Sequence, residues 1–343
     1  MNYIYYFIYS TLIITLFAFS SCGNKENKSN EKNKQEKVAQ DTSEALKLAE
    51  YLVEMGDYVN SRNFPSLIKA SSVYEELDGN THIIDMRHPD VYKKGHIKNA
   101  INVRFSDLPS HFENEIVPFE FDKIILVCYG GQIASYSTSL LRLMGYGNVY
   151  SMRWGMSAWD KKFAEDYWLS GVSSKYQDKL ENEPDDKAAP GKLPELNTGL
   201  NSGEEIHSAR ISKLFEQGLK NVFISADEVF EKPENYYIIN FDRKDKYLAG
   251  HIPEAIRYKP SATLGIMPTM RTIPTDKEVV VYCGTGHSSG FATAYFRLLG
   301  YKAHTLEHGA NSFMYDKMLE ERSTLSWLPF TDQEIHNYPY VTE

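Results

Sequence analysis

Residues 124–131 read I-I-L-V-C-Y-G-G, and residues 279–286 read V-V-V-Y-C-G-T-G, 155 positions further along the chain. Each stretch is an apolar run that ends in a cysteine and continues into a glycine-containing loop. A short run that is apolar on both faces is typical of a central strand in a parallel sheet. The two stretches therefore predict one α/β arrangement that occurs twice, with a cysteine at the same strand end in each copy.

The same offset relates residues on both sides of these stretches. Because it stays constant over about 60 residues, two copies of one domain are the simplest explanation, and the chain is long enough to form two cores. Strands that alternate with helices predict an α/β fold of two tandem domains, each a parallel sheet flanked by helices. The aligned segments are Ile83-Ile84 with Ile238-Ile239, Tyr92 with Tyr247, Gly95-His96-Ile97 with Gly250-His251-Ile252, Arg142 with Arg297, and Gly145-Tyr146 with Gly300-Tyr301.

Composition divides the chain into five predicted segments. They are an export signal or anchor (1–22), a flexible charged tether (23–42), a first α/β domain (43–170), a linker (171–212) and a second α/β domain (213–338). The linker carries Pro184, Pro190 and Pro194 together with several glycines, a composition that interrupts helices and strands. At the start of the first domain, the apolar pattern predicts a helix from Ser43 toward Gly56.

Residues 3–19 are almost wholly apolar and lead into Ser20, Ser21 and Cys22. A short apolar stretch that ends in small residues is typical of an export signal. The ending resembles the signal of bacterial lipoproteins, which implies lipidation of Cys22 and a protein that is membrane-anchored in the cell envelope and exposed outside the cytoplasm. Lysines follow the apolar run and none precedes it, which is the pattern of an uncleaved anchor, but we prefer the lipoprotein interpretation because Cys22 lies where lipidation requires it. Both interpretations stay open.

The formal net charge of −9 argues against a nucleic-acid partner, which requires a basic face. The sequence shows no zinc-ligand spacing, phosphate-binding loop or dinucleotide fingerprint, so we expect no metal and no cofactor. The chain has three cysteines: Cys22, Cys128 and Cys283. We do not expect a disulfide between the last two, because equivalent sites on two domains rarely come within the required Cα distance of about 7 Å.

Cys128 and Cys283 each end a predicted strand and precede a predicted helix, at the sheet edge where open α/β proteins bind ligands. Gly131 and Gly286, in the fourth loop position, permit a backbone that points its N–H groups at the sulfur. These dipoles and the helix N-terminus are expected to lower the thiol pKa and to hold a thiolate or persulfide. The alternative is a small buried apolar residue at a strand end. The repetition favours the reactive interpretation.

Further motifs resemble the rhodanese family of sulfurtransferases, arranged in tandem. Residues 83–97 are similar to the family's entry motif, in which Asp-x-Arg is followed by Gly-His-Ile, and residues 238–252 keep the Gly-His-Ile. Residues 154–159 (W-G-M-S-A-W) and 308–313 (H-G-A-N-S-F) resemble its closing motif. The resemblance covers roughly residues 60–165 and 220–318, which make up most of the mature chain.

The resemblance implies that a loop cysteine takes a sulfane sulfur from a donor such as thiosulfate or 3-mercaptopyruvate. The resulting persulfide then passes the sulfur to a thiophilic acceptor such as cyanide or a thiol. By motif match, Cys283 and Cys128 are the predicted sulfur carriers, and small sulfur-containing anions and thiols are the predicted partners. The predicted substrate-binding loops are Tyr129, Gly130, Gly131, Gln132 and Ile133 in the first domain, and Gly284, Thr285, Gly286, His287 and Ser288 in the second.

The two loops depart from the family pattern in different ways. The sixth position often carries Arg or Thr in the family, but here it holds Ile133 in one loop and Ser288 in the other. Gln132 is expected to supply a donor in the first loop. His287 is expected either to add positive charge near the second sulfur or to be a solvated loop histidine. We predict that the second loop is the better enzyme and that the first is the less active half. The alternative is a non-catalytic sulfur-relay or binding module.

Three further residue pairs have predicted roles. Asp85 and Arg87 are predicted to form a buried, hydrogen-bonded support at a strand end, with a surface ion pair as the alternative; the second domain has Asn240 and Asp242 there. His96 and His251 are interpreted as structural. A phosphatase of this fold requires Arg where the loops carry Ala134 and Ser289, so phosphate hydrolysis is not expected.

Overall fold

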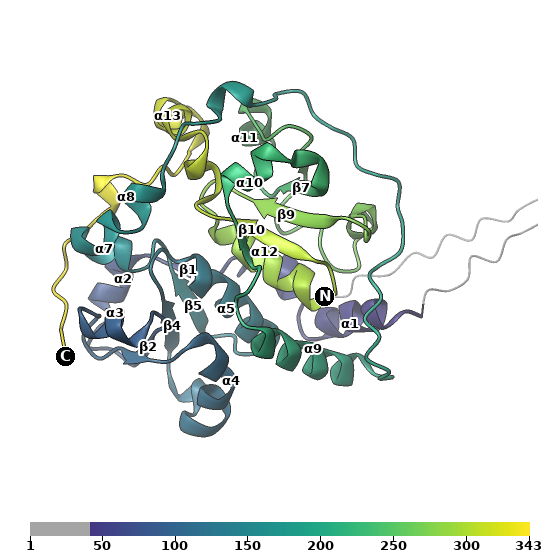
Figure 1. Cartoon of the computed structure of the whole chain (residues 1–343). Coiled ribbons are helices and arrows are strands. Elements are labelled where there is room, and N and C mark those ends of the chain that lie inside the picture. The colour runs from purple at the N-terminus through teal and green to yellow at the C-terminus, as the bar shows by residue number, and fades with distance from the viewer. Residues whose placement is uncertain (1–41) are drawn as a thin grey trace, which may run out of the picture. The chain divides into compact units, whose positions relative to one another are not determined.

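The computed structural model describes residues 42–343 (Figure 1). The predicted signal or anchor at residues 1–22, its lipidation candidate Cys22 and nearly all of the predicted tether lie outside the described residues. None of the helices within residues 42–343 combines the length and the hydropathy that a bilayer-spanning segment requires.

Two five-stranded sheets form the framework of the described chain, and their paired strands are parallel. The first sheet has the order β1-β5-β4-β2-β3 and the second has the order β6-β10-β9-β7-β8, so both follow one plan. This confirms the predicted fold class of two tandem α/β domains. The strands are β1 (Leu67–Ile68), β2 (Thr81–Asp85), β3 (Ile101–Asn102), β4 (Lys123–Val127), β5 (Val149–Met152), β6 (Phe223–Ile224), β7 (Tyr236–Asn240), β8 (Ile256–Arg257), β9 (Glu278–Tyr282) and β10 (Ala303–Leu306).

The strands that lead to the cysteines occupy the middle of their sheets because their apolar side chains are buried on both faces. β4 lies between β5 and β2, and β9 lies between β10 and β7. Their register is the same, since Ile83 pairs with Ile125 and Ile238 pairs with Val280. The structure therefore places Cys128 and Cys283 at equivalent points of the two sheets.

Helices cover both sheets, and the longest follow the cysteine loops or flank the linker (Figure 1). The two loop helices are α5 (Gln132–Leu143) and α12 (His287–Leu298). The other α-helices are α1 (Glu44–Glu54), α2 (Ala70–Glu75), α3 (Pro89–Lys93), α4 (Leu108–Ser110), α6 (Met156–Trp159), α7 (Lys161–Glu165), α8 (Trp168–Gly171), α9 (Gly203–Gln217), α10 (Ala226–Glu231), α11 (Lys244–Ala249), α13 (Tyr315–Glu320) and α14 (Arg322–Leu325).

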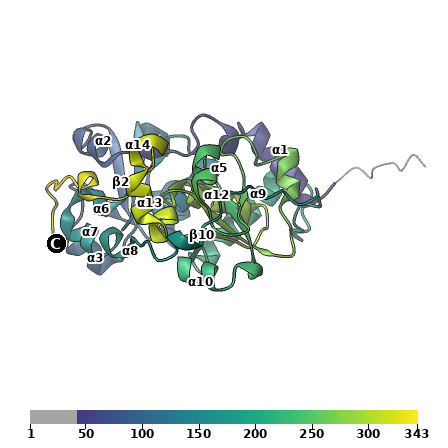
Figure 2. The same ribbon diagram turned by 90° about the horizontal axis from the view of Figure 1, so that it is seen from above.

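The two α/β halves share one apolar core. α5 and α12 pack against each other, as the view from above shows (Figure 2), and Ser139 donates a hydrogen bond to the carbonyl of Phe291 (2.9 Å). The same buried cluster contains Leu126 of the first sheet and Val281 of the second. A shared apolar interface of this kind fixes two domains relative to each other. The cysteine loops, which precede these helices, are therefore held close to the contact between the halves.

The predicted helix after Ser43 is confirmed as α1, and Ser43 accepts the N–H of Leu46 at its N-terminus. α1 lies beside α9 (Figure 1). α9 begins at Gly203, inside the predicted linker 171–212, and this helix was not predicted from the sequence. The missed signal is a capping box in which the side chains of Ser202 and Glu205 each accept a backbone N–H of the other.

The remaining linker and the C-terminal tail cross between the halves. Thr198, at the end of the linker, donates from its backbone N–H and its hydroxyl to the Glu44 carboxylate at the start of α1 (2.8 Å each). The tail returns to the first half, where the carbonyl of Pro339 accepts the indole N–H of Trp159 (3.0 Å). These contacts add to the α5–α12 packing in tying the two halves together.

We predict that Leu48→Ala lowers the free energy of unfolding by about 2–4 kcal/mol, because Leu48 on α1 is fully buried and its loss leaves a cavity. Urea denaturation measures the change. Met55, at the end of the same helix, is half exposed, so Met55→Ala serves as the control and should change the stability little. Equal effects of the two substitutions would show that α1 is not part of the folded body.

Candidate active site

Cys128 lies directly after β4 and is 1% exposed. Its sulfur accepts hydrogen bonds from the backbone N–H groups of Gly131 (3.1 Å) and Ala134 (3.4 Å). The first loop therefore curls around its sulfur, and the first turn of α5 supplies one of the donors. Gly131 adopts a φ of 86°, in the left-handed region that glycine allows without strain.

Burial raises the pKa of the Cys128 thiol above its ordinary value, and the N–H groups of Ala134 and Gly131 offset part of that rise. The expectation that the loop lowers this pKa is therefore wrong for the resting protein. A sulfur that is almost fully enclosed has no water to solvate its thiolate, and this loss exceeds the stabilisation that the amide dipoles provide.

The closing motifs seat the loops. The N–H of Met156 donates to the carbonyl of Cys128 (2.9 Å), and the N–H of Ala310 donates to that of Cys283 (3.0 Å). The glycines before them, Gly155 and Gly309, lie so close to these same carbonyls that a Cβ atom would overlap them. Glycine in the closing motif therefore permits the close approach of two backbone segments beneath each cysteine.

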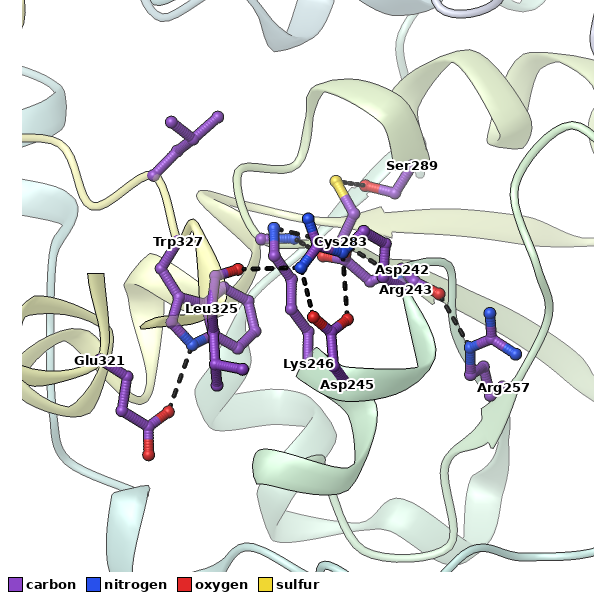
Figure 3. Close-up of polar contacts among 12 residues, drawn as sticks. Asp242, Arg243, Asp245, Lys246, Arg257, Cys283, Ser289, Glu321, Leu325 and Trp327 are labelled. Atoms are coloured by element: carbon purple, nitrogen blue, oxygen red, sulfur yellow. Dashed lines mark hydrogen bonds and ion pairs between the residues drawn. The ribbon is translucent and has the colours of Figure 1, made fainter. Parts of the chain in front are cut away.

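Cys283 lies after β9 and is 5% exposed. Its sulfur is 3.7 Å from the hydroxyl of Ser289, and that hydroxyl is 2.8 Å from the hydroxyl of Thr305 (Figure 3). Ser289 occupies the position that Ala134 has in the first loop. In the sequence, Ser289 stands out only because it replaces the arginine of a phosphatase, and its place beside the sulfur was missed.

Charged side chains surround the second loop (Figure 3). Asp242 accepts the N–H of Gly284 (3.0 Å) and lies 3.6 Å from the ammonium of Lys246. That ammonium is 4.8 Å from the ring centre of Trp327, whose ring lies against Gly284. Arg243, about half exposed, is paired with Asp245 at the same edge. Lys246 and Trp327 were not among the predicted site residues, because they lie far from Cys283 in sequence.

The first loop borders a cavity of about 330 Å³ instead. Its walls are mainly aromatic and aliphatic, and burial together with the nearby Cys128 raises the pKa of Tyr167, so this phenol remains protonated. The cavity is lined by Arg87, Val91, Tyr129, Met156, Phe163, Asp166 and Tyr167. An apolar lining of this kind disfavours a doubly charged anion, because the anion would lose its hydration.

Asp85 and Arg87 form a fully buried ion pair with 2.6 Å between Oδ2 and Nη2. Arg87 also donates to the carbonyl of Gly95 (2.6 Å), so it links the end of β2 to the Gly-His-Ile segment. The pair is therefore not the surface ion pair of the alternative interpretation. Both residues support the strand end, and Arg87 also forms part of the cavity wall.

The fourth residue after each cysteine reaches into the other half. Gln132 accepts the N–H of His308 (3.0 Å) and donates to the carbonyl of Leu306 (3.2 Å). In the reciprocal contact, Nε2 of His287 accepts the N–H of Trp154 (3.1 Å). Trp154 and His308 immediately precede the equivalent glycines of the two closing motifs and both have a positive φ. We call this reciprocal pair of contacts the loop exchange.

The loop exchange corrects two expectations. His287 is neither solvated nor charged, because it is fully buried and burial lowers its pKa to about 3. Nε2 lies 3.1 Å from both the backbone N–H of Trp154 and the carbonyl of Gly130, and Nδ1 lies 2.8 Å from the hydroxyl of Thr285. Gln132 is also fully buried and bonded across the interface, so its amide is not available to a substrate anion. The remaining predicted loop residues stay around their own cysteine.

We predict that Gly286→Ala lowers the free energy of unfolding by about 2–4 kcal/mol. The φ of 73° is unfavourable for alanine, and the added methyl group would overlap the Gln132 side chain. Urea denaturation provides the measurement. Gly147→Ala is the matched control, because an added methyl group there would meet no atom within 4 Å beyond its chain neighbours. A Gly286→Ala protein as stable as the control would contradict the loop exchange.

The buried histidines predict acid sensitivity. Burial lowers the pKa of His287 to about 3 and that of His308 to about 4, so each is neutral when folded and gains a proton on unfolding below its ordinary pKa of 6.5. The unfolded chain binds more protons between about pH 6.5 and 4, so the free energy of unfolding falls as the pH falls through that range.

His287→Gln isolates one of these contributions. At pH 7 the variant should have a lower free energy of unfolding than the wild type. The difference between the two free energies should become smaller at pH 5, because only the wild type has a histidine at position 287 that gains a proton on unfolding. His336→Gln, at an exposed position, is the control and should show no such narrowing. A pH-independent difference for His287→Gln, measured by urea denaturation, would contradict a neutral buried ring.

Comparisons with known proteins place this arrangement in a family. A model of the rhodanese-like domain matches residues 69–162 and 225–316. Thiosulfate sulfurtransferase GlpE of Pseudoalteromonas translucida is 35% identical over 100 residues, which cover 29% of this chain and 91% of that protein. A tRNA uridine(34) hydroxylase of Prochlorococcus marinus is 32% identical over 108 residues, which cover 29% of this chain and 32% of that protein.

Two solved structures align with a larger share of the chain. SseA of Escherichia coli, a 3-mercaptopyruvate sulfotransferase, is 16% identical over 71% of this chain and 98% of its own, with a TM-score of 0.25. Thiosulfate sulfurtransferase of Pseudomonas aeruginosa is 16% identical over 79% of this chain and 47% of its own, with a TM-score of 0.26. The ranges matched by the family model make up more than half of the chain, and each contains a cysteine loop. The chain therefore belongs to the rhodanese-like family and contains two of its domains in tandem.

Proposed function

We propose that this protein is a sulfurtransferase that moves a sulfane sulfur from a small anionic donor, such as thiosulfate or 3-mercaptopyruvate, to a thiophilic acceptor such as cyanide or a thiol. The observation that carries the proposal is the position of the two sulfurs. Each lies at the carboxyl end of a central parallel strand with polar groups beside it: the Cys128 sulfur accepts the N–H groups of Gly131 and Ala134, and the Cys283 thiol donates to the hydroxyl of Ser289 (3.7 Å).

The proposed reaction has two steps. The cysteine sulfur, after losing its proton to water, attacks the sulfane sulfur of thiosulfate, and sulfite leaves with the electrons of the donor's S–S bond. The acceptor then attacks the outer sulfur of the persulfide, forms its own bond to it and releases the cysteine as a thiolate. In the first loop, the N–H groups of Gly131 and Ala134 point at the Cys128 sulfur and would stabilise an anionic persulfide between the steps.

We assign the anionic donor to the second domain. Lys246 and Arg243 bring positive charge to the edge of its loop, and Ser288 offers a partly exposed hydroxyl in the sixth position. A charge near the entrance attracts a small dianion and raises its local concentration. Asp242 and Asp245 partly neutralise these cations, so the attraction depends on a donor that displaces one of the pairs.

We assign a relay or binding role to the first domain. Its loop has Ile133 in the sixth position, and the cavity beside it is mostly apolar. Such a cavity suits a weakly charged acceptor thiol better than thiosulfate. The alternative of a non-catalytic sulfur-relay or binding module thus applies to the first domain alone. In this role Cys128 carries a sulfur atom but does not catalyse the whole reaction.

With thiosulfate and cyanide as substrates, the wild-type protein should form thiocyanate, and Cys283→Ser should lower the rate at least about tenfold because the principal carrier is lost. Cys128→Ser should have the smaller effect. Colorimetric detection of thiocyanate measures both. No product from the wild type with either thiosulfate or 3-mercaptopyruvate, or full activity in Cys283→Ser, would contradict the proposal.

Mass spectrometry of peptides from donor-treated protein separates the two halves. A peptide with Cys128 that gains the mass of one sulfur atom in the Cys283→Ser background supports a relay role for the first domain. A peptide that never gains this mass leaves the first domain a scaffold.

A further inference from the structure

His251 presents an unsatisfied nitrogen in the second domain. The residue is fully buried, and its ring is stacked on Tyr247 with 3.9 Å between ring centres. Its Nδ1 lies 2.8 Å from the carbonyl of Tyr247, which only accepts, so Nδ1 carries the proton. Nε2 is therefore left with a lone pair, and among the described residues it has no hydrogen-bond partner. A buried acceptor without a partner is unfavourable unless something binds it.

Two carboxylates of the linker lie beside the imidazole of His251. Glu181 forms an antiparallel bridge with His251, in which each N–H donates to the other's carbonyl (2.9 and 3.0 Å). Asp185 donates its backbone N–H to the hydroxyl of Tyr247 (3.1 Å). The backbones of both acidic residues are thus fixed next to the imidazole. Ligand atoms of Glu181, Asp185 and His251 lie within 4.8 Å of one another.

Two basic residues of the second domain are bonded to other partners: Lys317 pairs with Glu321 (2.8 Å), and Arg257 donates to the carbonyl of Asp242 (3.0 Å). One oxygen of Glu181 accepts the N–H of Glu254 (3.1 Å), which leaves its second oxygen available. Two carboxylates and one buried imidazole therefore converge at this point of the linker. Glu181 and Asp185 are also exposed, so their side chains are free to rotate.

We propose that Glu181, Asp185 and His251 bind one divalent transition-metal cation of the Zn²⁺ type. An imidazole and two carboxylates suit such a cation better than a purely oxygen-ligated Ca²⁺ or Mg²⁺. Bonds of about 2.0–2.2 Å place the ligand atoms of a tetrahedral site about 3.4 Å apart, which small rotations of the two exposed side chains achieve. A proton on Nδ1 donated to a backbone carbonyl is the support that metal-binding histidines commonly have.

The equivalent histidine of the first domain has no such surroundings. His96 makes the same Nδ1 contact with a tyrosine carbonyl, that of Tyr92 (3.0 Å), and the same ring stacking. Its antiparallel partner is Val341, an apolar residue, where His251 has Glu181. The site thus arises from the linker and not from the repeated fold. A bound cation would fasten residues 181–185 to the second domain, independently of sulfur transfer.

Isothermal titration calorimetry with ZnCl₂ tests the proposal on the full chain, without an affinity tag and in the Cys22→Ser/Cys128→Ser/Cys283→Ser background, which removes all three thiols. We expect one saturable site per chain. Glu181→Gln/Asp185→Asn should weaken Zn²⁺ binding at least about tenfold. Glu183→Gln/Asp186→Asn removes the same charge from neighbouring exposed residues of the linker and should leave binding unchanged.

Equal Zn²⁺ affinities of the two double variants, or no saturable binding by the parent protein, would overturn the proposal. A parallel titration with CaCl₂ tests the class of cation, and tighter binding of Ca²⁺ than of Zn²⁺ would also overturn it. A second readout does not depend on affinity. Zn²⁺ should slow proteolytic cleavage within residues 181–192 of the parent protein and of Glu183→Gln/Asp186→Asn, but not of Glu181→Gln/Asp185→Asn. Unchanged cleavage in all three proteins would contradict the fastening of the linker.

Discussion

The packing of α5 against α12, completed by the loop exchange, is the constraint on which both cysteine sites depend. Each helix begins at a cysteine loop, so the contact that joins the domains also fixes the two loops. Gln132 accepts the backbone N–H of His308, and His287 accepts that of Trp154. Each loop residue therefore bonds to the residue that precedes the closing-motif glycine of the other domain. A buried polar group that lacked its partner would be costly, so each loop needs the other domain to satisfy these hydrogen bonds.

This constraint also accounts for the state of the resting site. The first cysteine loop lies in the domain interface, where Cys128 is buried away from water. Burial raises the pKa of the Cys128 thiol, although two loop amides donate hydrogen bonds to its sulfur. The donors matter most once the sulfur is charged, because a preorganised dipole stabilises an anion without further rearrangement. His287 is neutral for the same reason: the interface that needs its lone pair also excludes the water that would solvate a proton on it.

Sequence patterns were sufficient for the parts of the fold that local order determines. β4, β9 and the helices after them follow from long apolar runs and glycine loops, and α1 follows from its cap and periodicity. The edge strands β1, β3, β6 and β8 have two residues each, too few for a period to show. The roles of Gln132 and His287 were predicted wrongly because their partners lie in the other domain. Ser289, Lys246 and Trp327 were missed for a related reason, since only the folded chain brings them to Cys283.

The divergence of the two copies is most informative where Arg87 corresponds to Asp242. In the first domain, Arg87 forms an ion pair with Asp85 and donates to the carbonyl of Gly95. Its charge is therefore balanced at the strand end, and the nearby cavity is mainly apolar. In the second, Asp242 turns to the loop, accepts the N–H of Gly284 and draws Lys246 toward it. At the same strand end, Arg87 of the first domain is thus bonded to Asp85 and Gly95, whereas Asp242 of the second domain contacts the backbone of the cysteine loop. The same fold therefore places a mainly apolar cavity beside one cysteine loop and charged side chains beside the other.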